Sequence, residues 1–105
     1  MDAESLIQEM TRRIVTGFSP KKVILFGSYA NGTANPKSDV DLLVVISDVV
    51  DKRQMAIIIR RALADLPVAK DIVVTTPEEI AARGDLVGTV LRPALREGRT
   101  LYERA

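Results

Sequence analysis

Acidic residues in and beside one polar loop carry the chemistry that this sequence suggests. In the stretch FGSYANGTANPKSDVDLLVV, residues 26–45, Gly27 and Ser28 stand at one end, and Asp39 and Asp41 stand at the other. Successive side chains on a strand point to opposite faces, so two aspartates separated by one residue project in the same direction. Their carboxylates repel each other unless a cation lies between them. The spacing therefore predicts a cation site at the mouth of a buried strand.

Mg²⁺ is the cation that fits this pair of carboxylates. It takes oxygen ligands and is usually held by one or two carboxylates, with the phosphates of a substrate completing its shell. The other end of the loop suits such phosphates, because Gly27 lets the backbone approach closely and Ser28 can offer its hydroxyl and amide groups. The two ends of the loop together predict a phosphate-bearing ligand bound with Mg²⁺.

A third carboxylate is expected in such a site, either as a further metal ligand or as a base for an attacking hydroxyl. Asp71 is the candidate, because it lies near the start of a later apolar run that reads KDIVVT. Asp71 also has a purely structural interpretation, since an aspartate that follows a lysine at the start of a strand commonly forms a solvated ion pair.

The loop residues have structural interpretations as well. Gly27 and Ser28 alone would suit an ordinary turn between a strand and a helix. Asp39 could cap a turn at the start of the strand. Asp41 is the hardest of these residues to explain structurally, because an unpaired charge within an apolar run costs free energy unless a metal or a partner offsets it.

The composition restricts the chemistry further. The chain has neither His nor Cys, so the commonest metal ligand and general base, thiolate metal sites and disulfides are all excluded. Fifteen Lys and Arg against 14 Asp and Glu give a net charge of +1, which provides no bulk electrostatic reason to bind nucleic acid or an anionic membrane. Without a signal peptide or a membrane-spanning apolar run, we expect a cytoplasmic protein.

Apolar runs predict the strands that must position the acidic residues. Residues 22–26 and 70–75 read as short strands, and residues 40–46 are almost entirely apolar apart from Asp41. A nearly continuous apolar run is typical of a strand that is covered on both faces. We therefore expect residues 40–46 to form the central strand of the sheet and residues 100–102 to form an edge strand.

Helical periodicity predicts helices over residues 3–16, 51–65 and 85–97. The middle helix is predicted from one apolar stripe: Met55, Ile58, Ile59, Ala62 and Leu66. Three consecutive isoleucines, residues 57–59, cannot all point one way around a helix, so part of this run is expected to be exposed. Exposure would favour a partner or self-association surface, whereas burial against another helix would explain the run nearly as well.

Capping and breaking residues predict where the later helices begin and end. Thr76, Pro77 and Glu79 form a capping-box pattern that opens a helix, which Gly84 interrupts. Pro93 lies inside the predicted last helix and is expected to kink it or split it in two. At 105 residues the chain has room for one core, so we expect a single α/β domain across residues 1–105, with a small mixed sheet and helices packed against it.

The loop resembles the signature of a known superfamily. Gly27 and Ser28, ten intervening residues, and Asp39-Val40-Asp41 resemble the pattern G-S-x10-D-x-D of the polymerase-β-like nucleotidyltransferases. The fuller pattern, GS-x-A-x-G-xxxxx-SD-x-DL, is matched at Gly27, Ser28, Ala30, Gly32, Ser38, Asp39, Asp41 and Leu42. The chain length and the later segments KDIVV and LREGRTLYER narrow the resemblance to the minimal nucleotidyltransferases, over nearly the whole chain.

The resemblance implies a fold, a reaction and roles for five residues. In that family the motif aspartates and a later strand aspartate coordinate Mg²⁺ and the triphosphate, and the loop Gly-Ser holds the phosphates. Carried over, the catalytic and metal-binding roles fall on Asp39, Asp41 and Asp71, and the nucleotide-binding roles fall on Gly27 and Ser28. Members of this kind are typically antitoxins paired with an HEPN-domain toxin, and some transfer AMP from ATP to a tyrosine of that toxin with release of pyrophosphate.

Other functions remain open at this level. The protein could be a non-catalytic antitoxin that neutralises its toxin by binding alone, or it could transfer a nucleotide to a small molecule or to RNA. The last class ranks lower, because we expect no second domain to bind such an acceptor and find no concentrated basic patch in the sequence. The sequence also departs from the family at Asn31, where many relatives carry arginine. A homo-oligomer or a hetero-oligomer is compatible with the sequence.

Overall fold

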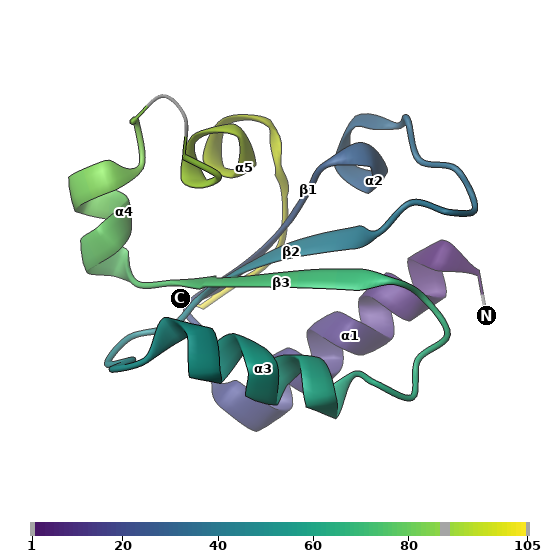
Figure 1. The fold of residues 1–105 in the computed structure, drawn as a ribbon, viewed down its shortest axis with the longest axis horizontal. Helices are drawn as coiled ribbons and strands as arrows, with labels where there is room; N and C mark the ends of the chain where they lie inside the picture. The colour runs from purple at the N-terminus through teal and green to yellow at the C-terminus, as the bar shows by residue number, and fades with distance from the viewer. Residues whose placement is uncertain (1, 87–88, 105) are drawn as a thin grey trace.

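The computed structural model describes residues 2–86 and 89–104 (Figure 1). Within these residues it contains five helices and one four-stranded sheet, which confirms the predicted α/β fold class. The helices are α1 (Ala3–Phe18), α2 (Ser28–Asn31), α3 (Lys52–Ala62), α4 (Pro77–Arg83) and α5 (Leu91–Glu97). The strands are β1 (Lys22–Phe26), β2 (Val40–Val45), β3 (Lys70–Thr75) and β4 (Arg99–Glu103). Among the described helices none is both long enough and apolar enough to cross a membrane.

The sheet is mixed, as predicted, and its strands lie in the order β3-β2-β1-β4. β1 runs antiparallel to both β2 and β4, whereas β2 and β3 run parallel. A parallel pair needs a long crossover connection, which α3 provides. The apolar strand β2 therefore lies in the interior of the sheet, and β4 forms one edge, both as the sequence predicts. The other edge is β3.

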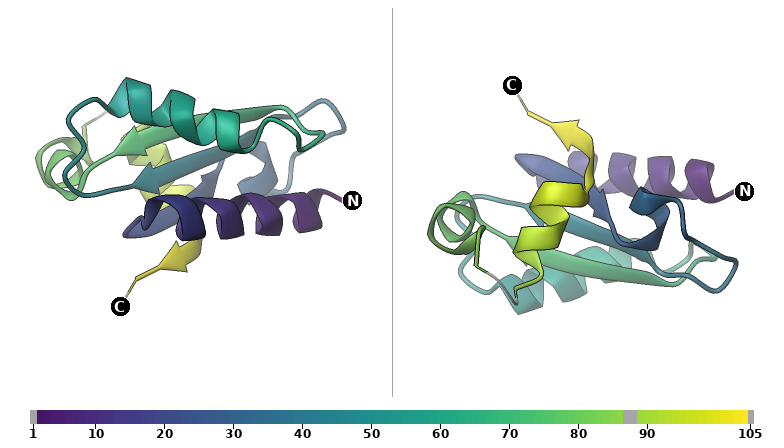
Figure 2. Two further views of the ribbon diagram at one scale, coloured as in Figure 1. Left: turned by 90° about the horizontal axis from the view of Figure 1, so that it is seen from below. Right: turned by 90° about the horizontal axis from the view of Figure 1, so that it is seen from above.

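Two helices cover one face of the sheet and enclose the larger part of the core. Figure 2 (left) shows α1 and α3 lying across this face. Side chains alternate between faces along each strand, so every second residue of β1, β2 and β3 points toward these helices. The buried residues of this cluster are Leu6, Ile7, Met10, Ile14, Val23, Leu25, Val40, Leu42, Val44, Ile46, Ile59, Leu63, Leu66, Ile72 and Val74.

The buried stripe of α3 differs from the predicted one. Ile59 and Leu63 are fully buried, whereas Ile58 is 41% exposed and Ala62 is exposed. The prediction that Ile58 and Ala62 face the core is therefore wrong. A run of isoleucines fits two neighbouring stripes equally well, and packing against the sheet selects the one centred on Ile59. The expectation that part of the isoleucine run is exposed is confirmed, since Ile57 is also 37% exposed.

The opposite face of the sheet carries a smaller apolar cluster beneath α5 (Figure 2, right). Its buried members are Ile24, Leu43, Leu91 and Ala94. The helix predicted over residues 85–97 begins only at Leu91, and residues 87 and 88 of that prediction lie outside the described residues. Pro93 thus occupies the first turn of α5, where a backbone N–H would have no partner within the helix.

The start of α4 follows the predicted capping pattern in part. The Thr76 hydroxyl accepts a hydrogen bond from the backbone N–H of Glu79 at 3.1 Å, Pro77 opens the helix, and Gly84 caps its end. The Glu79 side chain does not return to Thr76. It accepts hydrogen bonds from Lys52 Nζ, at 2.6 Å, and from the hydroxyl of the buried Thr75. This carboxylate therefore joins the starts of α3 and α4 to the end of β3.

These contacts predict a pH-dependent contribution of Glu79 to stability. The hydrogen bond from Lys52 and then that from Thr75 lower the pKa of Glu79 below its ordinary value of 4.5. A lowered pKa in the folded state means that the ionised group stabilises the fold above pH 4.5, and that this contribution is lost as the pH falls through the folded pKa. We expect Glu79→Gln to lower the free energy of unfolding at pH 7 by about 1 kcal/mol.

Urea denaturation of the native protein and Glu79→Gln at several pH values between 7 and 3 measures this contribution. The difference in unfolding free energy between the two proteins should shrink as the carboxylate of the native protein takes up its proton. A difference that stays constant down to pH 3 would show that the charge of Glu79 does not stabilise the fold.

Candidate functional site

Three of the predicted residues meet where β1 ends and β2 and β3 begin. The antiparallel register places Phe26, the last residue of β1, opposite Asp41, and the parallel register places Asp41 beside Asp71. Residues paired across neighbouring strands point to the same face, and the strands lie about 4.8 Å apart. The structure therefore brings Asp41 and Asp71 together. Phe26 is the third residue in this row across the strands, and Gly27 directly follows it.

Gly27 has a backbone conformation that other residues rarely adopt, with φ 74° and ψ −154°. A Cβ added at this position would overlap the Oδ2 atom of Asp41. The chain can therefore turn from β1 into α2 against the Asp41 carboxylate only because residue 27 has no side chain. Ser28 is the first residue of α2, as expected, and the amide groups that begin a helix have no partner within it.

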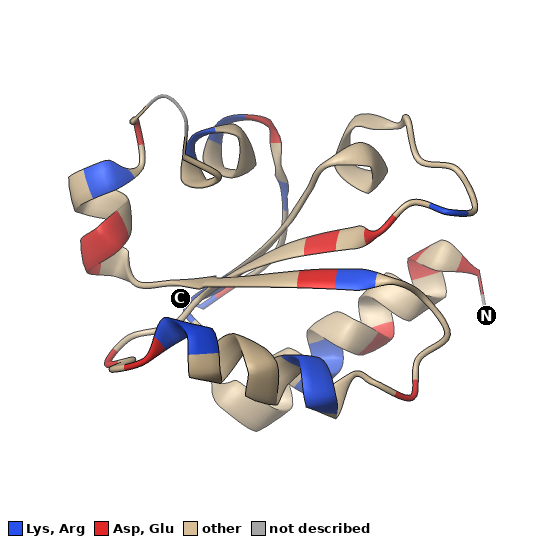
Figure 3. Ribbon diagram, viewed as in Figure 1, with Lys and Arg blue, Asp and Glu red and all other residues tan. Residues whose placement is uncertain are grey.

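The paired residues Asp41 and Asp71, called the carboxylate row below, lie on the face of the sheet that α5 covers. Leu42 packs in the cluster beneath α1 and α3, and its neighbour Leu43 packs beneath α5. By alternation Asp41 points to the same face as Leu43, one step nearer the end of the sheet. Asp41 is half-buried and Asp71 is exposed. Figure 3 shows acidic positions side by side near the same end of β2 and β3.

The electrostatics of the row are unfavourable for ionised Asp41. Burial raises the pKa of the Asp41 carboxyl, and the nearby charges of Asp71 and Asp39 raise it further. Each of these causes disfavours the negative form, and a bound cation would counter all of them. The donor set therefore fits a hard cation such as Mg²⁺, which prefers carboxylate oxygens.

Asp39 occupies a different position from the other two aspartates. It is exposed and precedes β2, which begins at Val40. Within the part of the chain that the structure describes, no three acidic side chains are grouped closely enough to hold a metal ion by themselves. A Mg²⁺ site with one or two carboxylates and the phosphates of a substrate does not need such a group. The roles of Asp39, Asp41 and Asp71 as metal ligands stay predictions.

A cavity of about 220 Å³ adjoins the Gly27 turn. Some of its lining residues are not predicted from the sequence to lie near the site. Its lining residues are Phe26, Gly27, Asn31, Pro93 and Glu97. The Asn31 amide oxygen accepts hydrogen bonds from the N–H and the hydroxyl of Thr33, so it is engaged within its own loop. Pro93 and Glu97 come from α5, far along the chain, and no motif in the sequence connects them to the loop.

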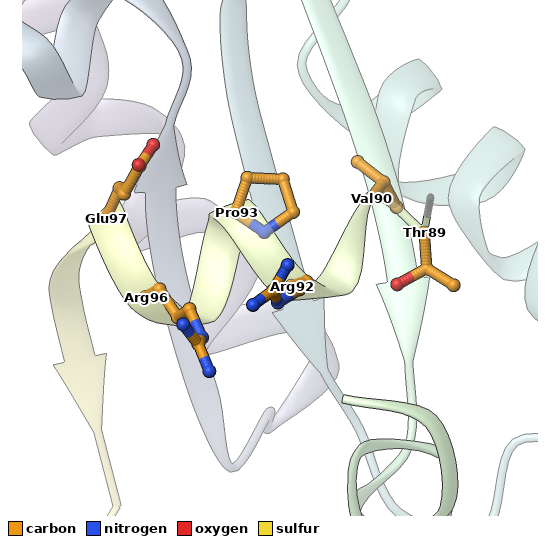
Figure 4. A pocket seen from close by; sticks show the side chains of 6 residues that line it. All are labelled: Thr89, Val90, Arg92, Pro93, Arg96 and Glu97. Carbon is orange, nitrogen blue, oxygen red and sulfur yellow. The ribbon is translucent and has the colours of Figure 1, made fainter. Parts of the chain in front are cut away.

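A second cavity, of about 590 Å³, lies along the outer side of α5 and extends to the residues before it (Figure 4). Its lining residues are Thr89, Val90, Arg92, Pro93, Arg96 and Glu97. In Figure 4 the side chains of Arg92 and Arg96 point to one side of the helix, away from Glu97 and Pro93. This lining includes none of the five predicted site residues, so the cavity is separate from the carboxylate row.

The chain is similar in sequence to one family model and to two named proteins. A family model described as "Nucleotidyltransferase domain" matches residues 6–96. Two proteins of Methanocaldococcus jannaschii, both provisionally named protein adenylyltransferases, are similar in sequence. One is 31% identical over 104 residues, which is 97% of this chain and 100% of that protein. The other is 36% identical over 64 residues, 59% of this chain and 65% of that protein.

Solved structures share the fold at lower sequence identity. A provisionally named nucleotidyltransferase from Sulfolobus solfataricus has a TM-score of 0.67 at 19% identity, covering 95% of this chain and 79% of that chain. A toxin–antitoxin crystallised with AMP-PNP has a TM-score of 0.59 at 24% identity, covering 92% and 73%. The complex of a tri-AMPylated HEPN toxin of Shewanella oneidensis with an MNT antitoxin has a TM-score of 0.57 at 19% identity, covering 96% and 72%.

The close approach of Gly27 to Asp41 predicts different effects of alanine at two glycines. Gly32 also has a positive φ, 82°, but a Cβ there would meet nothing within 4 Å. We expect Gly32→Ala to lower the unfolding free energy by about 1 kcal/mol through backbone strain alone. Gly27→Ala combines a backbone region that is almost confined to glycine with the overlap with the Asp41 carboxylate, and it should cost about 3 kcal/mol. Denaturant titration of both variants measures the difference.

A double-mutant cycle isolates the overlap. Asp41→Ala removes the overlapping oxygen, whereas its own Cβ stays 3.6 Å from the position of an added Cβ at Gly27, an ordinary contact. In this background Gly27→Ala should cost less than it does in the native protein, because only the strain of the backbone conformation remains. An undiminished cost would show that Asp41 is not the group that Gly27 must avoid.

The raised pKa of Asp41 predicts that its ionised form opposes folding in the absence of metal. The folded state binds the proton of Asp41 more tightly than the unfolded chain, in which the pKa has its ordinary value of 3.8. Stability is therefore lost as the pH rises from this value through the folded pKa. We expect Asp41→Asn to be more stable than the native protein at pH 7 in EDTA, and thermal unfolding measures this. A lower melting temperature for Asp41→Asn would contradict the prediction.

Proposed function

The chain belongs to the nucleotidyltransferase domain family, and from this premise we propose that it transfers AMP from ATP to a tyrosine hydroxyl of an HEPN-domain toxin, with Mg²⁺. The observation that carries the proposal is the row in which Asp41 lies beside Asp71, next to the turn at Gly27. Adenylyl transfer to protein is the activity for which the two M. jannaschii relatives are named. The HEPN partner is suggested by the toxin–antitoxin complex that shares the fold.

Five residues are proposed to bind the nucleotide and the metal. Asp39, Asp41 and Asp71 would hold Mg²⁺, which would neutralise charge on the triphosphate and on the departing pyrophosphate. The Gly27 turn lets phosphate oxygens approach the backbone, because no side chain stands there. The hydroxyl of Ser28 and the first amides of α2 are donors for those oxygens.

The proposed transfer is a single displacement at the α-phosphorus. The tyrosine oxygen forms a bond to this phosphorus, the bond between the α-phosphorus and the bridging oxygen breaks, and pyrophosphate leaves with the electron pair. The phenolic proton passes to a carboxylate, for which we propose Asp71. This residue is exposed on the edge strand and stands beside Asp41, so a phenol can reach it without entering the core.

The product would carry a phosphodiester and a nucleoside on the toxin's tyrosine. The modification replaces a neutral hydroxyl with a bulky group that bears one negative charge. A toxin that needs this tyrosine in a binding or catalytic surface would lose activity, which is the proposed antitoxin effect.

Transfer of label from ATP tests this function. The purified protein is incubated with ATP labelled at the α-phosphate, Mg²⁺ and the HEPN-domain protein of the same organism. Asp41→Asn and Asp71→Asn are compared with Asp48→Asn, which makes the same chemical change in the loop between β2 and α3, after the opposite end of β2. We expect label on a tyrosine of the toxin, a loss of about 10²-fold or more in the first two variants, and no loss in Asp48→Asn.

Other outcomes would identify a different function. Neutralisation of the toxin by Asp41→Asn as effectively as by the native protein, without label on the toxin, would indicate an antitoxin that acts by binding alone. Label on RNA that disappears in Asp41→Asn would show that the acceptor is a nucleic acid.

A further inference from the structure

A groove of about 330 Å³ runs between α3 and β3 and reaches the carboxylate row. Its lining residues are Arg53, Ala56, Ile57, Arg60, Asp71 and Ile72. Asp71 belongs both to this groove and to the row with Asp41. α3 packs on the opposite face of the sheet from the carboxylate row, so the groove and the candidate site meet at Asp71, on the edge strand.

The α3 wall of the groove is apolar in the middle and basic at both ends. Its four lining residues follow the spacing i, i+3, i+4, i+7, which places them on one face of a helix. Ile57 is 37% exposed there, between the exposed residues Arg53 and Arg60. The sequence of α3, KRQMAIIIRRA, has four basic residues and no acidic one, and Figure 3 shows the basic positions toward its two ends.

The two groove arginines keep their charges available. Within residues 2–86 and 89–104 neither Arg53 nor Arg60 forms a salt bridge, whereas Lys52 is paired with Glu79. Arg60 donates one hydrogen bond, 3.1 Å long, to the backbone oxygen of Lys70 at the start of β3. This contact directs the guanidinium across the groove toward the strand without neutralising its charge.

The β3 wall offers backbone groups as well as a side chain. Ala69 and Thr75 direct their carbonyl oxygens to β2, where they accept from Val40 and Ile46 at 2.8 and 2.9 Å. The direction of these groups alternates along a strand of a parallel pair, so Ile72 turns its N–H and C=O toward the open edge. Such an edge is a ready site for an extended segment of another chain.

We propose that this groove docks the acceptor protein through an acidic segment and so presents the acceptor hydroxyl at Asp71. The inference rests on the proposed transfer to a protein and adds the surface that would select the acceptor. Acidic side chains of the partner pair with Arg53 and Arg60, and apolar side chains cover Ile57. The hydroxyl-bearing residue then lies at the end of the groove that Asp71 shares with the site.

The lining favours an acidic protein segment over a nucleic acid. An apolar centre flanked by arginines is typical of protein interfaces. Single-stranded nucleic acids are usually held by aromatic side chains that stack on the bases and by a longer basic track along the backbone. Among the described residues that line the groove none is aromatic, and the two arginines lie on one face of a single helix rather than along a longer track.

Binding of defined copolymers tests the proposal without relying on catalysis. The probe is a fluorescein-labelled copolymer of glutamate and tyrosine, compared with a copolymer of lysine and tyrosine and with a labelled single-stranded RNA. Fluorescence anisotropy is recorded without ATP for the native protein, Arg53→Glu, Arg60→Glu and Arg60→Ala. The matched control is Arg61→Glu, which makes the same charge change on the same helix at an exposed residue outside the groove.

The native protein should bind the glutamate–tyrosine copolymer in preference to both other probes. Arg53→Glu and Arg60→Glu should weaken this binding about tenfold or more, Arg60→Ala should weaken it less, and Arg61→Glu should not weaken it. Equal weakening by Arg61→Glu would show a response to net charge and overturn the proposal. Preference for the lysine copolymer, no binding of the acidic one, or stronger binding of RNA through the same arginines would overturn it as well.

Failure of this proposal can be told apart from failure of the proposed reaction. The same binding should persist in Asp41→Asn, which is expected to reduce transfer about 10²-fold or more. If the copolymer accepts AMP, Arg60→Glu should raise the KM for the copolymer and leave kcat unchanged, because the arginine acts in docking. A fall in kcat at saturating copolymer would show that Arg60 acts in the transfer step instead.

Discussion

The arrangement of the candidate site depends on the contact between the backbone of residue 27 and the Asp41 carboxylate. Only a residue without a side chain fits there, and the backbone conformation of Gly27 is one that other residues rarely adopt. The contact requires β1 to end where β2 begins, which an antiparallel pair of strands provides. The turn into α2 and the position of Ser28 follow from the same geometry. One glycine thus joins the part of the motif suited to phosphate to the part suited to a metal.

The fold holds like charges together by fixing their backbones. Asp41 and Asp71 lie side by side because β2 and β3 are paired along their whole lengths. Behind them, the apolar cluster beneath α1 and α3 keeps both strands in place, so the repulsion between the two carboxylates, which adds to burial in raising the pKa of Asp41, cannot separate them. Stability on one face of the sheet therefore sustains an unfavourable arrangement on the other, which is common at functional sites.

Much of this arrangement could be predicted from the sequence, because local signals agree with it. The apolar runs give the bounds of β1 and β3, and the hydroxyl of Thr76 caps α4 as its position predicts. The placement of Asp41 beside Asp71 follows once their strands are known to be parallel neighbours. Three features could not be predicted: which isoleucine of α3 is buried, the cavity that α5 completes beside Gly27, and the groove between α3 and β3. Each depends on how elements distant in the chain rotate and pack against one another.

The unequal size of the two apolar clusters has a consequence for how such a protein can diversify. Among the residues that the structure describes, most buried side chains lie beneath α1 and α3, and four lie in the cluster beneath α5. Substitutions on the outer side of α5 and along the groove alter surface residues, which usually change stability little. Natural selection can therefore vary the surfaces that meet other molecules while the carboxylate row and its supporting core stay constant. A scaffold of this kind can acquire new partners without having to evolve a new fold.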